Sequence, residues 1–512
     1  MKVLDISRIA EVIKDGDNVA VSGFSKSGMA DYTYAGIAES FLKTGHPAGI
    51  WFICNALGGS GEKKKYNDRF WPEGLVAGAR IAHIQLAPGV RDQIESNKIP
   101  GYMYPLGVMA QLYRDMGAGK PGTISKVGLG TFIDPRQEGG RMNDLTTEDV
   151  ARLIEIDGEE WLFYPKFPID VAIFKATYSD EKGNVSMENE PSVSDALYNA
   201  KAAKQNGGIV IAQVEDVVKT EDLMARNIEV PASLVDYVII APKELAKQTI
   251  LIDYDPVLCQ KERQDLSQIP PRPLDIRKII ARRAAMEIRE GDVVNLGYGI
   301  PEVCGDVAAE EGISEQMTLT VEGGVMGGVP GSGLEFGTAR NAEYVCDMAQ
   351  MMDYYDGGGL DISVLGFGEI DEEGNVNASK FGSSVGPGGF INISCGTKRN
   401  VFCGSLTAVG LKVSAGGGKL RIDEEGKKKK FVKKVEQITF NAQRATHDGH
   451  EIIYITERAV FRERDGKVLL TEVAPGIDLQ TQVLDQIEFD VQVADDLKEM
   501  DPRIFTDEPM GL

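Results

Sequence analysis

The sequence has few of the residues that build disulfide frameworks and metal sites. Its 512 residues include six cysteines, none in a Cys-x-x-Cys pair, and four histidines, two of them in the polar stretch THDGH. Scattered cysteines of this kind predict buried free thiols rather than disulfides or a structural zinc site. So few histidines also argue against a multi-histidine metal site. We therefore expect no bound metal.

Long apolar runs and an excess of positive charge are also missing. No stretch of about 18 apolar residues occurs, and the opening MKVLDISRIAEVIKDGD has the pattern of a helix, so we expect no membrane association and a cytoplasmic location. The formal net charge of −23 argues against nucleic acid or an anionic membrane as a partner. Two lysine runs, EKKKY at 62–66 and GKKKKFVKK at 426–434, are interpreted as solvated faces rather than phosphate clamps.

Internal duplication is the strongest signal of organisation. RIAEVIKDGDNVAVSGFSKSG near the start resembles IIARRAAMEIREGDVVNLGYGIPE after residue 278, and in both a helical pattern ends in Gly-Asp before an apolar strand. DVAIFKATYSDEKGNV from Asp170 likewise matches DISVLGFGEIDEEGNV from Asp361. Two landmarks in the same order predict two related halves.

Each half has the pattern of an α/β domain. Apolar runs such as GIVIAQV alternate with helical patterns such as YTYAGIAESFLKTG, which is typical of largely parallel sheets covered by helices. The polar segment between the halves ends in a proline cluster, as linkers do. We predict an N-terminal domain over 1–252, a linker over 253–273 and a C-terminal domain over 274–512. Ligands in such folds bind at strand ends or between domains, so we expect an active cleft between the halves.

One carboxylate stands at such a strand end. In MTLTVEGGVMGGVPGSG, residues 317–321 read as a strand, and Glu322 follows directly, ahead of Gly323 and Gly324. An arbitrary glutamate at this kind of junction most often caps the following turn. Here the glycines leave it sterically open, and the cluster GSSVGPGGFINIS offers backbone N–H groups to a developing oxyanion.

A glutamate in this place has a distinct chemical use. With an unperturbed pKa near 4.3 it is ionised at neutral pH, so it can attack a thioester without a neighbouring base. The sequence has no convincing Ser-His-Asp or Cys-His arrangement for the same task. Attack gives a mixed anhydride, which the departed thiolate can open to leave a glutamyl thioester. Glu322 is therefore the predicted nucleophile.

Several short motifs follow one another along nearly the whole chain: KVGLGTFIDPRQEGGRMND, VVNLGYGIPE, LTVEGG, GPGGF, QITFN and YITERAVF. In this order they resemble class I coenzyme A transferases, most closely the single-chain propionate (lactate/acetate) CoA-transferase type. The resemblance implies ping-pong exchange of CoA between a short-chain acyl-CoA and a small carboxylic acid through a glutamyl-CoA thioester. It also implies coenzyme A as substrate and covalent intermediate, no permanently bound cofactor, and a homo-oligomer, commonly a tetramer.

The resemblance assigns roles to individual positions. Glu322 corresponds to the glutamate that forms the thioester, and GPGGF to the motif whose backbone N–H contributes to the oxyanion hole, with Gly388 as the expected donor. The glycine loops SGFSKSG (22–28) and LGGSG (57–61) are expected in the N-terminal half of the cleft. Substrate or CoA binding is expected at Gly323, Gly386, Gly389, Gly23, Gly28 and the position of Leu106.

One position departs from the family pattern. In YMYPLGVMAQLYRD the family normally has a glutamine before the glycine, as the second oxyanion donor, and this sequence has Leu106. Leucine cannot donate a hydrogen bond, so that contact must be replaced, moved or lost. Alternatively, the loop is shifted in register and Leu106 lines the acyl pocket.

Other functions remain open at this point. Water could intercept the anhydride or the thioester, which would make the protein an acyl-CoA hydrolase. The halves could instead form a non-catalytic sensor of a CoA ester or sugar phosphate, with Glu322 orienting the ligand. A nucleotide-binding dehydrogenase fits less well, because SGFSKSG is not a GxGxxG fingerprint.

Overall fold

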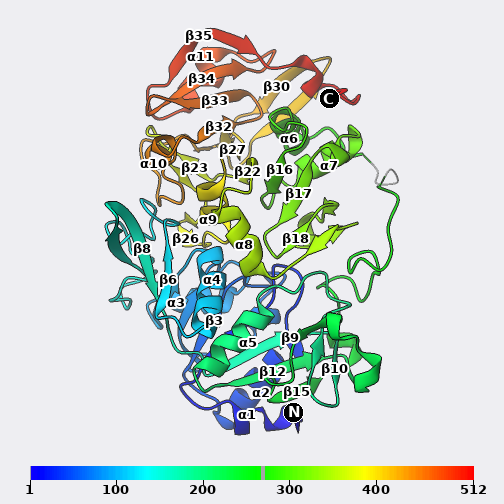
Figure 1. Cartoon of the computed structure of the whole chain (residues 1–512). Coiled ribbons are helices and arrows are strands. Elements are labelled where there is room, and N and C mark those ends of the chain that lie inside the picture. The colour runs from blue at the N-terminus through cyan, green and yellow to red at the C-terminus, as the bar shows by residue number, and fades with distance from the viewer. Residues whose placement is uncertain (1, 267–270) are drawn as a thin grey trace.

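The computed structural model describes residues 2–266 and 271–512, so residues 267–270 of the predicted linker lie outside the described part. Each half is built on one large sheet, with the N-terminal half at the bottom of Figure 1 and the C-terminal half above it. The N-terminal sheet has the order β1-β15-β12-β9-β2-β3-β4-β5, and all its neighbouring strands run parallel. Its strands are β1 (Lys2–Val3), β2 (Asn18–Val21), β3 (Ile50–Cys54), β4 (Val76–Ile81), β5 (Gly101–Met103), β9 (Val171–Lys175), β12 (Ile209–Val214) and β15 (Tyr237–Ile240).

The C-terminal sheet is mixed, with the order β21-β18-β17-β16-β22-β27-β32-β33-β34-β35. Its central strands β17, β16, β22, β27 and β32 are parallel, and antiparallel pairs flank them on both sides. The predicted α/β class with largely parallel sheets is confirmed. The strands are β16 (Val293–Leu296), β17 (Thr318–Val321), β18 (Val325–Met326), β21 (Tyr344–Val345), β22 (Ile362–Gly366), β27 (Arg399–Cys403), β32 (Glu451–Ile455), β33 (Ala459–Arg464), β34 (Lys467–Val473) and β35 (Gln492–Glu499).

The duplication seen in the sequence is present in the topology. The parallel order β15-β12-β9-β2-β3 in one sheet matches β32-β27-β22-β16-β17 in the other. The next strand differs, because β4 is parallel to β3 and β18 is antiparallel to β17. The two matched aspartates make the same contact: Asp170 accepts a hydrogen bond from the backbone N–H of Asn18 (2.8 Å), and Asp361 accepts one from that of Val293 (3.0 Å). Each carboxylate thus ties the start of one strand to its parallel neighbour.

The Gly-Asn-Val landmarks also form equivalent turns. Asp180 accepts the backbone N–H of Asn184 at 2.8 Å, and Asp371 accepts that of Asn375 at 2.9 Å. The side-chain amide of each asparagine donates to the same aspartate. In each copy the aspartate side chain accepts a hydrogen bond from the backbone of the following turn. This contact requires a fixed distance in sequence between the aspartate and Gly-Asn-Val, which explains why the spacing recurs.

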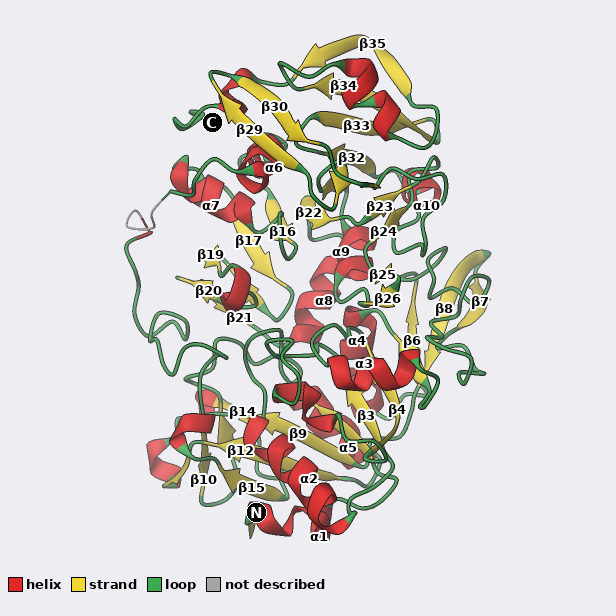
Figure 2. Ribbon diagram, turned by 180° about the vertical axis from the view of Figure 1, so that it is seen from behind, coloured by secondary structure: helices red, strands yellow, loops and turns green. Residues whose placement is uncertain are grey.

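Helices join the two halves at the centre of the molecule (Figures 1 and 2). Helix α4 (Leu106–Gly117) is apolar on most sides and packs between α5 (Ala196–Gln205), α8 (Met348–Asp356) and α9 (Phe390–Gly396). Gly107 donates its N–H to the side chain of Asn392 at 2.9 Å, and Gln111 donates to Asp356 at 2.8 Å. A helix buried on several sides carries no polar face, which accounts for its sequence. The other longer helices are α2 (Asp31–Thr44), α3 (Pro88–Glu95), α6 (Ile276–Ala285), α7 (Val303–Glu310) and α10 (Ala442–His447).

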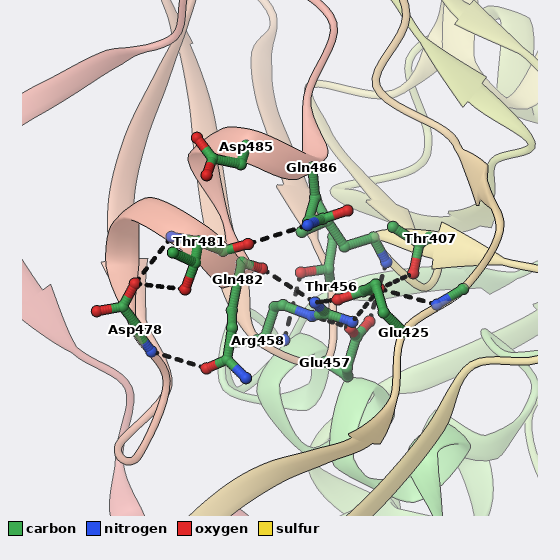
Figure 3. Close-up of polar contacts among 12 residues, drawn as sticks. Thr407, Glu425, Thr456, Glu457, Arg458, Asp478, Thr481, Gln482, Asp485 and Gln486 are labelled. Carbon is green, nitrogen blue, oxygen red and sulfur yellow. Dashed lines mark hydrogen bonds and ion pairs between the residues drawn. The ribbon is translucent and has the colours of Figure 1, made fainter.

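A fully buried arginine fixes the outer layer of the C-terminal half (Figure 3). Arg458 donates to Glu457 at 2.5 Å, to Glu425 at 2.7 Å and to the backbone carbonyl of Gln482 at 2.9 Å. Glu457 in turn accepts the N–H of Leu406 at 2.9 Å. A buried guanidinium needs partners for all its donors, and these partners come from three separate segments. The network therefore fastens the segment around 404–430 to strands β32 and β33.

Five of the six cysteines are buried. Cys54, Cys259, Cys304, Cys346 and Cys403 are free and buried, as predicted, whereas Cys395 is exposed, so the expectation is wrong for that residue. In the described ranges no helix is long and apolar enough to cross a bilayer. No group of three or more potential metal ligands is found among those same residues.

Candidate active site

A cavity of about 700 Å³ lies between the two halves, at the carboxyl ends of β16, β17, β22 and β27. This is where the fold class predicted a ligand site. The N-terminal half contributes Phe24, Ser25, Lys26, Leu57, His83 and Leu106, and the C-terminal half contributes Gly297, Glu322, Gly366, Gly388, Gly389, Gly404 and Lys430, among others.

Glu322 is half-buried at the end of β17 and faces this cavity. No hydrogen bond to its carboxyl group is found among the described residues, so the carboxyl lies unpartnered against the protein wall. A Cβ atom built on Gly389 would lie 2.7 Å from Oε2 of Glu322 and 2.9 Å from its Cδ. Only glycine at 389 leaves the carboxyl in this position.

Burial changes the acid–base argument made from the sequence. Desolvation by the surrounding protein raises the pKa of Glu322 to about 7. The prediction that this carboxyl is fully ionised at neutral pH is therefore wrong for the unliganded protein. The same desolvation leaves its carboxylate form poorly solvated, which favours attack on an electrophile.

The glycines after Glu322 allow close packing of neighbouring groups. A Cβ on Gly323 would lie 2.7 Å from the ring of Phe24, and one on Gly324 would lie 2.0 Å from the carbonyl oxygen of Cys346. Gly324 also has φ +105°, where side chains are strained. Neither glycine is among the residues that line the cavity, and the missing side chain of Gly323 lets Phe24 approach the strand end. Ligand contact at Gly323 stays a prediction.

The GPGGF loop connects the two halves. Gly388 donates its N–H to the carbonyl of Ala82 at 2.9 Å and accepts the N–H of Leu106 at 3.0 Å. Because its N–H is already engaged, the choice of Gly388 as oxyanion donor is not supported. For the N–H of Gly389 we find no acceptor in the described part of the chain, and this residue touches Glu322. Gly386 has φ +92°, and a Cβ built on it would lie 2.8 Å from the Cα of His83.

The N-terminal glycine loops contribute through their non-glycine residues. Gly23 and Gly28 pack against each other, with a Cβ on Gly23 placed 3.0 Å from the carbonyl oxygen of Gly28, and neither lines the main cavity. Their close approach instead forms a tight loop that presents residues 24–26 to it. Ligand contact at Gly23 and Gly28 stays a prediction, and the residues of this loop that line the main cavity are Phe24, Ser25 and Lys26. The second loop does reach the cavity, through Leu57, Ser60 and Gly61.

Comparison with known proteins gives a consistent result. The coenzyme A transferase family pattern matches residues 5–241. The chain is 44% identical to caffeate CoA-transferase of Acetobacterium woodii, over 100% of this chain and 98% of the other. The chain belongs to the coenzyme A transferase family. It is 43% identical to acetate CoA-transferase YdiF of Escherichia coli K12, over 86% of this chain and 83% of that one.

Solved structures extend this result to the whole fold. The crystal structure of the acyl-CoA transferase YdiF apoenzyme from Escherichia coli O157:H7 superposes with a TM-score of 0.95 at 38% identity, covering 100% of this chain and 97% of the other. A thioester complex of the same protein with CoA superposes with a TM-score of 0.94. This chain is therefore a CoA-transferase of class I, with both related halves in one polypeptide.

Two lysines of the transferase cavity were not identified from the sequence. Lys26 is buried and donates to the carbonyl of Gly59 at 2.9 Å, and Lys430 is 9% exposed and donates to the carbonyl of Phe367 at 2.7 Å. The lysine run at 62–66 is exposed at its three lysines, as interpreted. In the run at 426–434 that interpretation is wrong for Lys430. The sequence signal for the burial of Lys430 was the aromatic residue directly after it, Phe431, which is buried in the structure.

The pH dependence of the transferase should follow Glu322. The ionised form of Glu322 is the predicted nucleophile, so kcat/KM for acetyl-CoA should rise about tenfold per pH unit below pH 7 and level off above it, because this parameter reports the free enzyme. Initial rates from pH 5 to 9 with acetate as acceptor measure it, and acetate stays ionised over most of this range. A profile that is flat between pH 5.5 and 8 would contradict the raised pKa.

Leu106 offers a separate test of the oxyanion site. It is buried at the start of α4, lines the cavity and hydrogen-bonds through its backbone to the GPGGF loop. We expect Leu106→Gln to raise kcat for short acyl-CoA exchange by at least about threefold, because one oxyanion donor is worth about 2.7–4 kcal/mol when fully aligned. Steady-state kinetics with several acyl groups and a thermal melt measure the effect. Unchanged kinetics in a normally folded variant would place this side chain away from the oxyanion.

Proposed function

We propose that this CoA-transferase moves CoA between a short-chain acyl-CoA and a small carboxylate by ping-pong exchange through a thioester on Glu322. The observation that carries the proposal is the unpartnered carboxyl of Glu322, held against Gly389 in a cavity shared by both halves. The thioester complex of the related YdiF with CoA supports the same chemistry.

The proposed reaction has two symmetrical halves. The Glu322 carboxylate attacks the thioester carbonyl carbon, the C–S bond breaks, and the CoA thiolate leaves a mixed anhydride. The thiolate then attacks the glutamyl carbonyl, releasing the first carboxylate and leaving CoA on Glu322. An acceptor carboxylate reverses these steps and takes the CoA away. The free N–H of Gly389 is the proposed donor to the oxyanion in each step.

We propose two classes of acyl group as substrates. Acetate-like acids follow from the propionate-type resemblance and from the related acetate CoA-transferase. A flat aromatic acid is the second candidate, since the caffeate enzyme is similar along its whole length. Three aromatic side chains that line the cavity favour an aromatic acid. The ring centroid of Phe336 lies 6.4 Å from that of Phe24 and 5.2 Å from that of Tyr298.

Covalent labelling tests the proposal. The protein is incubated with acetyl-CoA and no acceptor, reduced with borohydride, and digested for peptide mapping. We expect a modification at Glu322 that is absent from Glu322→Ala. A modification that persists in this variant, or an active enzyme that is never modified, would overturn the assignment. Release of free CoA without acceptor, as fast as exchange with acetate, would establish a hydrolase instead.

The assembly and domain limits belong to the same proposal. Domains over 1–252 and 274–512 are supported by the two sheets, whose strands fall within those ranges. The described part of the linker contacts both halves, because Asn341 donates to the carbonyl of Gln264 at 2.8 Å and Lys261 donates to the side chain of Asn189 at 2.6 Å. A homo-oligomer and a cytoplasmic location remain predictions from the sequence, which gel filtration and fractionation can test.

A further inference from the structure

Lys430 is a buried cation with no anionic partner on the wall of the catalytic cavity. Its ammonium makes one hydrogen bond, to the carbonyl of Phe367, and lies 4.1 Å from the centroid of that ring. Among the described residues no carboxylate lies within ion-pair distance of it. In a chain with net charge −23, a buried lysine without a carboxylate partner is unexpected.

The position of Lys430 is fixed by its backbone and by the layer beneath it. Ile370 of β23 (Glu369–Ile370) donates its N–H to the carbonyl of Lys430 at 2.8 Å, and Val432 donates to the carbonyl of Ile370 at 2.8 Å. Lys430 follows β31 (Lys428–Lys429), which pairs with β28 (Thr407–Ala408) inside the segment that the Arg458 network fastens. The side chain is therefore preorganised rather than free to swing.

The ammonium lies over the end of β27, three strands from the nucleophile. A Cβ on Gly404 would come 2.7 Å from Nζ of Lys430. The sheet order β17-β16-β22-β27 places Glu322 and Gly404 about 15 Å apart, given the usual spacing of neighbouring strands. Gly297 and Gly366 follow or end the two strands between them and also line the cavity. These glycines, which have no side chains of their own, form a floor of the cavity between Glu322 and Lys430.

The length of this floor fits the pantetheine arm of coenzyme A. About thirteen bonds separate the sulfur from the first phosphorus, and an extended chain that advances 3.3–3.6 Å per three backbone bonds spans about 15 Å over that length. We propose that Lys430 binds the pyrophosphate of CoA when the sulfur is joined to Glu322. This inference rests on the proposed function, whose thioester fixes one end of the arm.

The charge of Lys430 suits this task. Burial lowers the pKa of its ammonium to about 8, so it is mostly protonated at pH 7. Charged neighbours include Glu457, Lys428 and Glu369, none of them paired with it. A lysine ammonium has three N–H donors, and only one of them makes a hydrogen bond here. Phosphate oxygens would accept hydrogen bonds from the other two.

Binding of three ligands to two variants tests the proposal. Calorimetry with CoA, dephospho-CoA and pantetheine is compared for the wild type, Lys430→Met and the matched control Lys433→Met, which changes an exposed lysine of the same run. We expect Lys430→Met to weaken CoA and dephospho-CoA by about 10- to 100-fold, the range for a charge-assisted hydrogen bond, and to leave pantetheine unchanged. Lys433→Met should bind all three ligands as the wild type does.

Each alternative result overturns the proposal in a different way. If Lys430→Met lost affinity for CoA but kept its affinity for dephospho-CoA, Lys430 would bind the 3′-phosphate instead of the pyrophosphate. If Lys430→Met bound all three ligands equally more weakly than the wild type, Lys430 would have a structural role instead. Normal binding by Lys430→Met, with a loss of rate confined to acyl groups that carry a second carboxylate, would place the acyl group at this end. Labelling of Glu322 in wild type and variant at saturating acetyl-CoA reports the proposed function separately.

Discussion

Replacing Glu322 by alanine should reduce CoA exchange at least about 10,000-fold, because the covalent route loses its nucleophile. Glu322→Gln should be nearly as inactive, since an amide of the same shape cannot form the anhydride. Glu322→Asp should lose about 100-fold, because its carboxylate lies one C–C bond short and a displacement of about 1 Å is costly. Initial rates with acetyl-CoA and a carboxylate acceptor measure all three.

Stability distinguishes this loss from a folding defect. The folded-state pKa of Glu322 is raised to about 7, so the stability contributed by its protonated form is complete below its unfolded pKa and is lost as pH rises through 7. Glu322→Gln, which is neutral at every pH, should therefore gain in melting temperature relative to wild type between pH 5 and pH 8. A variant that loses both activity and stability at pH 8 would point to a structural role instead.

The sequence predicts the two halves and the candidate nucleophile because both predictions depend on local patterns. Asp170 and Asp361 recur because each closes the same contact between parallel strands. Glu322 is the predicted nucleophile because it ends a predicted strand and two glycines follow it directly in the sequence. Such features need no knowledge of distant segments.

Other residues of the site depend on contacts between the halves. Which N–H of the GPGGF loop is free depends on Ala82, which engages that of Gly388 and leaves that of Gly389 open. Lys430 belongs to a charged run, and it is buried where its backbone pairs with Ile370, a residue far away in the chain. The pKa of Glu322 depends on the cavity walls as a whole. Since these contacts join residues far apart in the chain, composition and spacing do not reveal them.

Substitution of the two adjacent glycines should separate the oxyanion site from its neighbour. At Gly389 the backbone has φ −78°, which alanine adopts without strain, but the new Cβ would lie 2.7 Å from Oε2 of Glu322. At Gly388 the reverse holds: φ is +51° and nothing lies within 4 Å of an added Cβ. Gly389→Ala therefore introduces a steric contact without backbone strain, whereas Gly388→Ala introduces backbone strain without a steric contact.

Gly389→Ala should lower kcat/KM by at least about 100-fold, since it displaces the carboxyl and crowds the oxyanion beside the free N–H. Its melting temperature should change little, because the clashing atom is the end of a flexible side chain. Gly388→Ala should keep activity within about tenfold and lose about 1 kcal/mol of stability from its left-handed backbone. Exchange kinetics and thermal melts of both variants measure this contrast. If Gly388→Ala were the more impaired enzyme, the oxyanion role would return to Gly388, and a nearly wild-type Gly389→Ala would remove Gly389 from the reaction.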